Sequence, residues 1–407
     1  MRDTTFYEQI LGLEKPWRVD RVELSVREGR VDVWLKHSCG EKWPCPKCEQ
    51  SLECHDHAPE RTWRHMDTCQ FQTLVHAQIP RVECDRCGVH QVRVPWAEPH
   101  SRFTLLMEAW ILQVLQQTET IQSTCELCGI GWEACQRIMH KAVTRAREQR
   151  ETPVYTRIGV DEKGWGYKKC CTVVCDLDKG TVEEVIPGND TESLKGFYDM
   201  LDEIQLEGIE AVSMDMWKAY IRATTDAVPQ GAEKIVFDRF HIMQNMNKAL
   251  NEVRKQEHCA LLADGCDALK GAMYNVLRSK ENVTQAGRVQ LREMQRMDLK
   301  TARAWRIKEA LRHLWSYTTK GWARRYFERW YSWAIRSRLP QVKRVATMLK
   351  NNIENVLTYF EHFITNALAE SLNSRIETIL RQARGFRNFD NLRTSILFYC
   401  GGLNITP

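Results

Sequence analysis

Three acidic residues, far apart in the sequence, stand where a metal-dependent enzyme could use them. Asp161 follows a strand-like run at residues 156–160, and Asp215 follows another at residues 211–214, so each is expected at a strand end. Glu370 lies on a predicted helix. Converging carboxylates can hold two Mg²⁺ ions, because magnesium prefers oxygen ligands. Such a pair of ions supports hydrolysis and transfer of phosphodiester bonds.

Each of these acids also has a purely structural interpretation. An aspartate directly after a strand commonly caps the helix that follows it. Four further aspartates compete as candidates for the metal-binding site: Asp176, Asp178, Asp190 and Asp238. Asp238 follows a strand-like run at residues 234–237, so it is either a group beside the site or a helix cap. The role of His241, three residues later, is open in the same way.

The helix that carries Glu370 has two distinct faces. It is predicted over residues 361–384 and ends at Gly385. The apolar stripe consists of Leu368, Leu372, Ile376 and Ile379, and the polar face of Asn366, Glu370, Asn373 and Glu377. Packed across a sheet, this helix could hold Glu370 beside the two strand-end aspartates.

Two Cys-x-x-Cys pairs near the start have the spacing of zinc ligands. They are Cys45-Pro-Lys-Cys48 and Cys84-Asp-Arg-Cys87. Two such pairs complete a tetrahedral structural Zn²⁺ site, whose closed shell leaves no position for catalysis. Nearby residues compete as ligands: Cys39, Cys54, His55 and His57. Cys125 and Cys128 share the spacing but lie in a predicted helix, and we interpret them as buried core thiols.

A helix-turn-helix is predicted after the cysteine pairs. Residues 121–127 form the first helix, residues 128–131 a glycine-containing turn, and residues 132–147 the second helix. In such motifs the second helix can enter the major groove of DNA. Its basic residues offer contacts to phosphates and base edges: Arg137, His140, Lys141 and Arg145.

The charge of the chain is uneven. The 407 residues carry a net charge of +5, yet residues 300–350 hold fourteen Lys and Arg against two acids, Glu309 and Glu328. This segment also contains Trp305, Trp315, Trp322, Trp330 and Trp333, together with the adjacent Arg324 and Arg325. A basic stretch with interleaved aromatic residues favours nucleic acid as a partner. The alternative is a solvated helical face over a tryptophan core.

Composition narrows the class of protein further. The hydrophobic fraction is 43% and the charged fraction 27%, both ordinary for a folded protein. Neither an apolar run long enough to span a membrane nor a signal peptide is expected. In the reducing location expected for such a chain, the sixteen cysteines are interpreted as metal ligands or buried thiols in place of a disulfide framework.

The segment order predicts a multidomain chain. Residues 1–100 form a small zinc-ribbon β domain, and residues 101–150 a helical helix-turn-helix domain. Residues 151–240 contain short strand-like runs that alternate with helices, which predicts an α/β domain. Residues 241–360 are helical throughout, and residues 361–384 add one more helix.

The ordered series of motifs resembles one family over nearly the whole chain. It is similar to the ISL-three family of bacterial insertion-sequence transposases, which belong to the DDE group with a ribonuclease H-like core. Besides the two cysteine pairs and the helix-turn-helix, the resembling segments are Arg61-Thr-Trp-Arg-His65, Gly159-Val-Asp-Glu-Lys163, Ser213-Met-Asp-Met-Trp-Lys-Ala-Tyr220, Phe237-Asp-Arg-Phe-His241, Asn366-Ala-Leu-Ala-Glu-Ser-Leu-Asn-Ser-Arg375 and Gly385-Phe-Arg-Asn-Phe389. One departure is Ala367, where the family often has glycine.

The resemblance implies a site and a reaction. The catalytic triad falls on Asp161, Asp215 and Glu370, which would bind two Mg²⁺ (or Mn²⁺) ions. These acids would belong to a catalytic core of residues 151–240 and 361–407, with the all-helical residues 241–360 inserted into it. Cleavage at the terminal inverted repeat would free a 3′-OH that attacks target DNA. Asp238, His241 and Asn373 are expected near the site. The zinc ribbon, with one structural Zn²⁺, and the helix-turn-helix would read the repeat, and the insertion would hold flanking or target DNA.

The same resemblance implies partners and a location. The partner is double-stranded DNA, and cleavage of two element ends in concert suggests a homodimer assembled on it. The location expected is the bacterial cytoplasm, with the protein associated with the nucleoid. Two other functions stay open. One is a sequence-specific DNA-binding regulator with an inactive core, and the other is a ribonuclease H-like nuclease without strand transfer. A purely structural zinc protein leaves the basic segment unexplained.

Overall fold

The structure, a computed structural model, describes residues 3–364 and 367–405, without the side chains of residues 367 and 370. The chain divides into two compact units, one of residues 1–149 with 403–407 and the other of residues 150–402. At the C-terminal end the structure differs from the prediction, in which all of residues 361–407 belong to the catalytic core. Ile405 is buried and its carbonyl accepts a hydrogen bond from Arg145 Nη2 (3.5 Å), so this end of the chain packs with the first unit.

The first unit begins with a four-stranded sheet in the order β1-β2-β7-β6. Its strands are β1 (Trp17–Ser25), β2 (Arg30–His37), β7 (Gln72–Ala77) and β6 (Arg61–Arg64), and helix α1 (Asp3–Ile10) precedes them. Strands β2 and β7 are parallel, and the other pairs are antiparallel. Trp17, Trp63 and Trp96 meet edge to face in the core beneath this sheet.

Two small hairpins carry the cysteine pairs. Strands β3 (Trp43–Pro44) and β4 (Ser51–Leu52) form one hairpin. Strands β8 (Pro80–Cys84) and β9 (Gly88–Gln91) form the other, to which β5 (Asp56–His57) adds a third strand. Each cysteine pair occupies the turn of its hairpin, so two turns that lie far apart in the sequence can face one metal ion.

Three helices complete the first unit: α2 (Leu105–Thr118), α3 (Ile121–Cys128) and α4 (Trp132–Gln149). The two helices predicted for the helix-turn-helix are confirmed, each one or two residues longer than expected. Thr120 caps α3 by accepting a hydrogen bond from the Ser123 N–H, and Gly129 ends it with a left-handed φ of 63°. Gly131 then directly precedes α4.

A hydrogen bond joins the start of α2 to the preceding sheet. His65, which follows β6, is buried and its Nδ1 lies 2.8 Å from the Oγ1 of Thr104, the residue that caps α2. The backbone N–H of Thr104 also donates to the carbonyl of Arg64. Burial lowers the pKa of His65 to about 4, so the ring is neutral in the folded protein.

The second unit is built on a five-stranded mixed sheet in the order β12-β11-β10-β13-β14. Its strands are β10 (Arg157–Gly166), β11 (Lys169–Asp176), β12 (Thr181–Pro187), β13 (Ala211–Met214) and β14 (Ile235–Phe237). Strands β10 to β12 form an antiparallel meander, whereas β13 and β14 run parallel to β10. Sequence analysis does not predict β12.

One strand boundary differs from the expectation. Asp161 was expected at the end of its strand, but β10 continues through it to Gly166 and pairs it with Val173 of β11. On the other side of β10, pairing with β13 stops at Gly159. Asp161 therefore lies just beyond the parallel part of the sheet, where the strand is paired on one side and has an open edge on the other.

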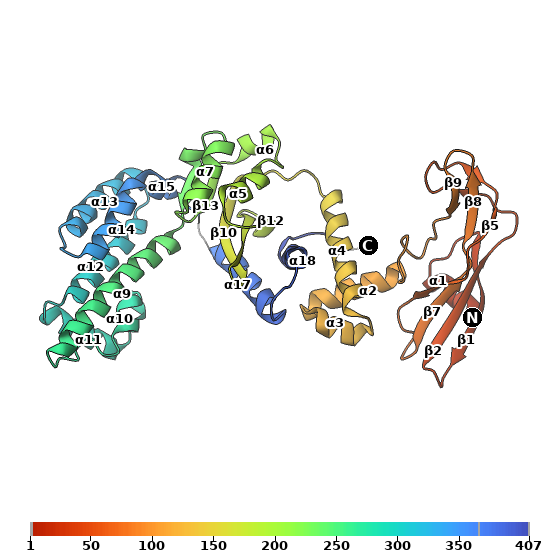
Figure 1. Ribbon diagram of the computed structural model, residues 1–407, viewed down its shortest axis with the longest axis horizontal. Coiled ribbons are helices and arrows are strands. Elements are labelled where there is room, and N and C mark those ends of the chain that lie inside the picture. The colour runs from red at the N-terminus through yellow and green to blue at the C-terminus, as the bar shows by residue number, and fades with distance from the viewer. Residues whose placement is uncertain (1–2, 365–366, 406–407) are drawn as a thin grey trace. The chain divides into compact units, whose positions relative to one another are not determined.

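Helices surround the sheet in the second unit (Figure 1). Between strands lie α5 (Thr191–Tyr198), α6 (Glu203–Gly208), α7 (Lys218–Ala227) and α8 (Gly231–Lys234), and at the end of the unit lie α17 (Ala367–Gln382) and α18 (Phe389–Cys400). Helix α17 is shorter than the predicted 361–384. Arg393 of α18 forms a bidentate ion pair with buried Glu184 of β12 (2.7 and 2.8 Å), which fastens α18 to the sheet.

A helical insertion separates β14 from α17, as the sequence predicts. Its elements are α9 (Arg239–Ala263), α10 (Met273–Leu277), η1 (Lys280–Asn282), α11 (Gln285–Arg296), α12 (Lys300–Arg312), η2 (His313–Ser316), α13 (Lys320–Ile335), α14 (Pro340–Asn351), α15 (Ile353–Leu357) and α16 (Tyr359–His362). Helices α9 to α14 gather beside the sheet (Figure 1). Among the described residues, every helix is too short or too polar to cross a lipid bilayer.

Candidate functional site

An acidic pocket of about 340 Å³ opens at one edge of the five-stranded sheet. Polar and ionisable side chains dominate its lining: Asp161, Glu162, Lys163, Ser213, Asp215, Asp238, His241, Asn373, Ser374 and Glu377. These residues come from β10, from the ends of β13 and β14, from the start of α9 and from α17. We call this cavity the acidic pocket.

The parallel strands explain why three aspartates meet there. Asp215 directly follows β13 and Asp238 directly follows β14, so both lie at the carboxyl ends of neighbouring parallel strands. Asp161 lies in β10, two residues beyond its last pairing with β13. Carboxyl ends of parallel strands share one edge of a sheet, and ligands commonly bind there. The structure thus brings Asp161 and Asp215 into one pocket, with Asp238 beside them.

Helix α17 completes the acidic pocket. Asn373 Nδ2 donates a 2.6 Å hydrogen bond to Asp161 Oδ2, and Ser374 and Glu377 line the same cavity. Glu370 belongs to α17, but its side chain lies outside the described residues, as does the whole of Asn366. The apolar stripe predicted for this helix includes Leu372, Ile376 and Ile379, which are buried, whereas Leu368 is exposed.

Hydrogen bonds hold the opposite rim of the acidic pocket. Asp215 Oδ1 accepts from the backbone N–H of Trp217 (2.9 Å), and Trp217 Nε1 donates to the carbonyl of Asn189 (2.8 Å). Asn189 Nδ2 in turn donates to Glu162 Oε2 (3.0 Å). This chain links Asp215 with the residue next to Asp161, so the two strands are bridged beyond the end of their pairing.

The electrostatic balance of the acidic pocket comes from a few groups. Burial raises the pKa of Asp215, with nearby Asp161 acting in the same direction, while His241 opposes the shift. His241 Nε2 lies 4.0 Å from Asp161 Oδ1 and 3.7 Å from Asp238 Oδ2. Lys163 Nζ lies 3.9 Å from Asp161 Oδ2. One lysine and one histidine thus face several carboxylates, so the pocket attracts cations.

The competing aspartates fall into two groups. Asp190 caps α5, and Asp176 accepts hydrogen bonds from the backbone N–H groups of Asp178 and Lys179, while Asp178 pairs with Arg157. None of these three acids lines the acidic pocket. Asp238 does, and it also accepts from the Phe240 N–H at the start of α9 (2.6 Å). Asp238 is therefore both a helix cap and a group beside the site.

Sequence reasoning missed several residues of the acidic pocket. Glu162, Lys163 and Ser213 line it, and Trp217 anchors Asp215. Glu162 and Lys163 stand next to Asp161, and Trp217 stands two residues after Asp215. Proximity to the candidate acids was the available signal, but it does not tell which neighbours turn inward, since β10 continues beyond its expected end.

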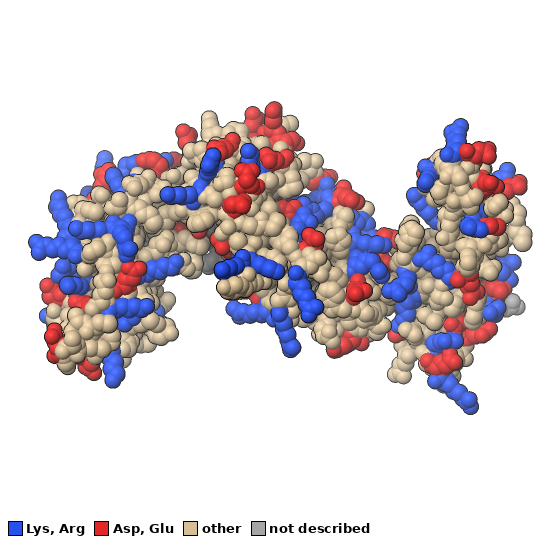
Figure 2. Space-filling model, in the orientation of Figure 1, with Lys and Arg blue, Asp and Glu red and all other residues tan. Residues whose placement is uncertain are grey.

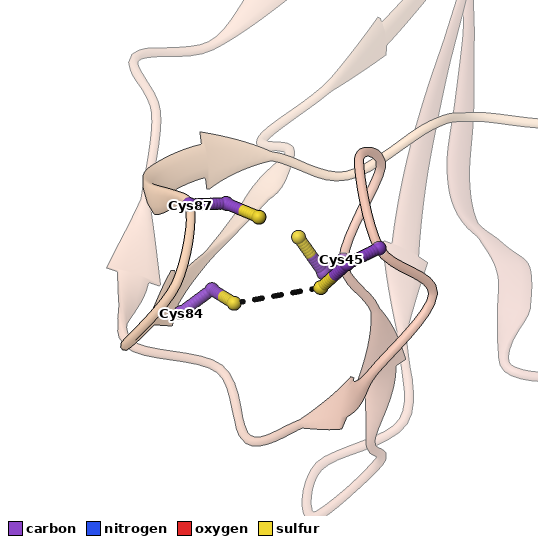
Figure 3. A group of neighbouring side chains, drawn as sticks. Cys45, Cys84 and Cys87 are labelled. Atoms are coloured by element: carbon purple, nitrogen blue, oxygen red, sulfur yellow. Dashed lines mark hydrogen bonds between the residues drawn. The ribbon is translucent and has the colours of Figure 1, made fainter.

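The four cysteines of the two pairs converge. The sulfur atoms of Cys45, Cys48, Cys84 and Cys87 all lie within 4.8 Å of one another, the only such group found among the described residues. Figure 3 shows Cys45, Cys84 and Cys87 directed toward one another from two separate turns. The backbone N–H of Lys47 is the main group that lowers the pKa of Cys45, to about 7. Four clustered thiols fit the tetrahedral ligand set of structural zinc.

The competing ligands point elsewhere. Cys39 is exposed, and Cys54 Sγ donates to the carbonyl of Asp56 (3.3 Å). His57 Nε2 lies 2.7 Å from His37 Nε2, and His55 Nδ1 lies 3.2 Å from Glu83. The structure thus gathers the four cysteines of the two pairs and leaves the neighbouring cysteines and histidines outside the cluster. Spacing alone had left those neighbours as competing zinc ligands.

The third cysteine pair lies in the helix-turn-helix. Cys128 is buried and Cys125 is half-buried, and both stand on α3. Burial raises the pKa of each thiol, so neither is a thiolate at neutral pH. The pair is part of the helical core, as interpreted from the sequence.

The basic residues of α4 differ in their surroundings. Arg137 and His140 are exposed. Lys141 Nζ and Arg145 Nη1 both pair with Glu98, at 3.2 and 3.1 Å. One acid thus offsets part of the positive charge of α4 and holds two of its cations in place.

The basic insertion shows a similar division. Figure 2 shows Lys and Arg side chains gathered over the insertion at the left of the view. Arg324 forms a bidentate pair with Glu354 (2.7 and 2.6 Å), whereas Arg325 lies over the ring of exposed Trp322 (5.1 Å). Three of the five tryptophans, Trp305, Trp315 and Trp330, are buried, and Trp322 and Trp333 are exposed. The alternative interpretation, in which the tryptophans form a core beneath a solvated helical face, thus holds for three of the five side chains.

Known proteins share these features in the same order. A zinc-finger model of transposases matches residues 41–87, and a helix-turn-helix model of the transposase family ISL3 matches residues 92–143. A transposase model of the same family matches residues 158–396, more than half of the chain. These matches define a transposase, an enzyme class that cuts and joins DNA. The chain belongs to the ISL3, or ISL-three, family.

Two curated relatives extend over almost the whole chain. A transposase for insertion sequence element IS1557 from Mycobacterium tuberculosis is 26% identical, over 95% of this chain and 93% of the relative. A transposase for insertion sequence element IS1001 from Bordetella parapertussis is 25% identical, over 93% and 94%. The resemblance drawn from the sequence motifs is therefore confirmed, and the helix-turn-helix makes DNA the partner of this chain.

Proposed function

We propose that this transposase cleaves DNA at the terminal inverted repeats of an insertion sequence and transfers the freed strand by DDE-type chemistry. In this proposal, Asp161, Asp215 and Glu370 hold two Mg²⁺ (or Mn²⁺) ions. The observation that carries it is the acidic pocket, which joins Asp161 and Asp215 from separate strands with one face of α17.

The helical period supports the placement of position 370. Ala369, Asn373, Ser374 and Glu377 of α17 line the acidic pocket. Position 370 precedes the last three by three, four and seven residues, and residues at those spacings share one helix face. The third acid of the triad is thus expected on the face of α17 that borders the two aspartates.

The donor set fits magnesium. The acidic pocket offers carboxylate and amide oxygens and a single lysine, and Mg²⁺ prefers oxygen ligands in small number, keeping several waters. When bound, a pair of such ions would stabilise the charge of the attacking and leaving oxygens of a phosphodiester. Burial is the main cause that raises the pKa of Asp215, and the nearby carboxylates of Asp161 and Glu162 act in the same direction.

The protein's own residues hold this site ready. Asn373 fixes one oxygen of Asp161, and the Glu162 N–H donates to the other (2.8 Å). The Trp217 N–H orients Asp215, and His241 stands between Asp161 and Asp238, where it can hold a proton beside the carboxylates. Because these partners restrict the carboxylates before DNA arrives, little ordering is left for the reacting complex.

The sheet topology supports a ribonuclease H-like core. An antiparallel meander, β10 to β12, is extended by the two parallel strands β13 and β14, with helices in the crossovers. The order along the chain also supports such a core. Asp161 and Asp215 precede the insertion, and α17 follows it. We assign residues 151–240 and 361–402 to this core and 241–360 to its insertion; the predicted end at residue 407 is moved to 402, because residues 403–407 belong to the first unit.

The other domains are assigned to DNA recognition. In this proposal, the zinc ribbon and the exposed residues Arg137 and His140 of α4 read the inverted repeat, with Lys141 and Arg145 contacting phosphates once they leave Glu98. Arg325 contacts flanking or target DNA. Arg324, which is paired with Glu354, does so less directly. Two copies acting on the two element ends form a homodimer, and binding to chromosomal DNA makes the protein nucleoid-associated in the cytoplasm.

A strand-transfer assay tests this function. The full chain is incubated with Mg²⁺ and labelled DNA that carries both ends of the element, next to unlabelled target DNA. We expect cleaved ends with a free 3′-OH and a joined product, both absent when Mg²⁺ is omitted. Binding without cleavage would favour the DNA-binding regulator, and cleavage without joining would favour the nuclease.

A further inference from the structure

A second pocket lies in the helical insertion, apart from the acidic pocket. Helices α11 and α12 form two of its walls, the turn η1 closes one end, and its volume is about 770 Å³. Cavities of this size accommodate small ligands of several hundred Å³. Figure 1 shows α11 at the end of the insertion that lies away from strand β10. We call this cavity the insertion pocket.

Its rim is cationic. Arg288 and Arg292 stand one turn apart on α11, and Arg306 faces them from α12. All three side chains are exposed, and within the described part of the chain none of them forms an ion pair. Three guanidinium groups around one cavity repel one another unless an anion lies between them.

The acids of the insertion pocket are already neutralised. Glu309 lies 2.8 Å from Lys308 Nζ and 2.8 Å from Arg312 Nη1, and Glu281 pairs with the same Arg312 group (2.9 Å). Lys308 is buried and also donates to the carbonyls of Val276 (2.9 Å) and Arg278 (2.8 Å). These partners leave the rim arginines without a carboxylate, so the ligand that fits is anionic.

The floor of the insertion pocket is apolar. Trp305, Leu291 and Val283 line it, and all three are buried. The indole Nε1 of Trp305 is inaccessible to solvent and has no hydrogen-bond acceptor among the described residues. Such a donor is costly to leave unpaired. Inorganic phosphate would contact only the arginines of the rim, whereas a group with a flat apolar face would also contact the apolar floor.

We propose that the insertion pocket binds one nucleotide of a DNA strand, with its phosphate on Arg288, Arg292 and Arg306 and its base over the apolar floor. Guanidinium groups bind phosphate through paired donors, and aromatic surfaces stack on bases of any sequence. This inference rests on the proposed function in one respect, namely that DNA passes over the insertion. It adds a specific site, and it favours an unpaired nucleotide over duplex.

The test is a binding measurement that needs no catalysis. Fluorescence anisotropy of a labelled single-stranded oligonucleotide and of the matched duplex is recorded with the full chain carrying Asp161→Asn, without added divalent metal. The test variant is Arg288→Gln with Arg292→Gln, and the control is Arg296→Gln, an exposed arginine of α11 outside the lining. Thermal unfolding establishes that all variants fold.

We expect the double variant to bind the single strand about tenfold more weakly at low salt. The slope of log affinity against log salt should fall by about 1.4, since each lost phosphate contact to a single strand removes about 0.7. The control should match the parent in both quantities. Trp305→Phe should weaken competition by a deoxynucleoside monophosphate while leaving competition by inorganic phosphate unchanged.

Three results would overturn the inference. The first is a double variant that binds the single strand like the control. The second is an equal loss for duplex and single strand, which would indicate general backbone contact. The third is competition by inorganic phosphate as strong as that by the nucleotide, which would show that no base is bound. Since cleavage is disabled throughout, failure of the catalytic proposal leaves these readouts unaffected.

Discussion

Asn373 Nδ2 donates a 2.6 Å hydrogen bond to Asp161 Oδ2, joining α17 to strand β10 across 212 positions of the sequence. The bond is charge-assisted, because its acceptor is a carboxylate. It fixes the rotamer of Asp161 at the mouth of the acidic pocket and draws α17 toward the sheet edge. A helix that follows a long insertion is thereby held against the strand that begins the domain.

Loss of this bond should weaken the site without abolishing it. In Asn373→Ala, Asp161 keeps its charge but loses a partner, so Mg²⁺ affinity or cleavage rate should fall by about 10- to 100-fold. Cleavage rates measured over a range of Mg²⁺ concentrations report both quantities. Thr378→Ala is the matched control, since this exposed α17 residue donates a hydrogen bond to the carbonyl of Ser374 (3.0 Å) and does not line the acidic pocket. An unchanged rate in Asn373→Ala would remove this residue from the site.

The two aspartates proposed as metal ligands make a sharper prediction. Asp161→Asn and Asp215→Asn keep size and shape but remove the negative charge that binds metal, so strand cleavage should fall by about a thousandfold or more. Affinity for repeat DNA should stay close to that of the unmodified chain. Asp178→Asn is the control, because this acid, in the turn between β11 and β12, pairs with Arg157 outside the pocket. Full cleavage by either test variant would exclude that residue from catalysis.

The zinc cluster predicts metal content and folding together. The purified protein should carry about one zinc per chain, measured by atomic absorption. Cys45→Ser should lose the metal, and the two hairpins should then become sensitive to protease, because binding energy in such sites is folding energy. Cys39→Ser and Cys54→Ser should keep it. Zinc retained in Cys45→Ser but lost in Cys54→Ser would contradict the assigned ligands.

Buried His65 predicts a loss of stability in mild acid. The unfolded chain binds a proton at the ordinary pKa of about 6.5, whereas the folded protein binds it only near a pKa of about 4. Between these values the unfolded state holds more protons, so stability falls as pH falls, by about 3 kcal/mol in total. Above pH 6.5 the contribution is fully present.

The midpoint of thermal unfolding, measured from pH 7.5 to 4.5, checks this dependence. His65→Asn cannot take up the proton and should show a flatter profile for the first unit. His100→Asn is the control, since His100 is exposed and has a left-handed φ of 62°, which asparagine tolerates. Profiles of equal slope for His65→Asn and the parent would show that this histidine does not set the acid sensitivity.

Local features of the chain were readable from the sequence. The spacing of Cys45 and Cys48 predicted a turn that presents two thiols, and Gly129 after a short helix predicted its end, since both depend on neighbours within a few residues. The ordered motifs also indicated the family, because each one is a short segment. The expected end of the strand at Asp161 was wrong, since pairing with β11 carries β10 on to Gly166.

Tertiary structure decided what depends on distant partners. Its spacing to Cys87 favoured Cys84 as a zinc ligand but left Cys54 as a competitor, and the packing of the two hairpins brings Cys84, not Cys54, to Cys45 and Cys48. Trp305 and Trp322 look alike in a basic segment, yet helix packing buries the first and leaves the second exposed. The sequence alone determined which residues could do chemistry, because type and spacing are local. Which of them meet was decided by the packing of strands and helices, because those contacts join residues from tens to about two hundred positions apart.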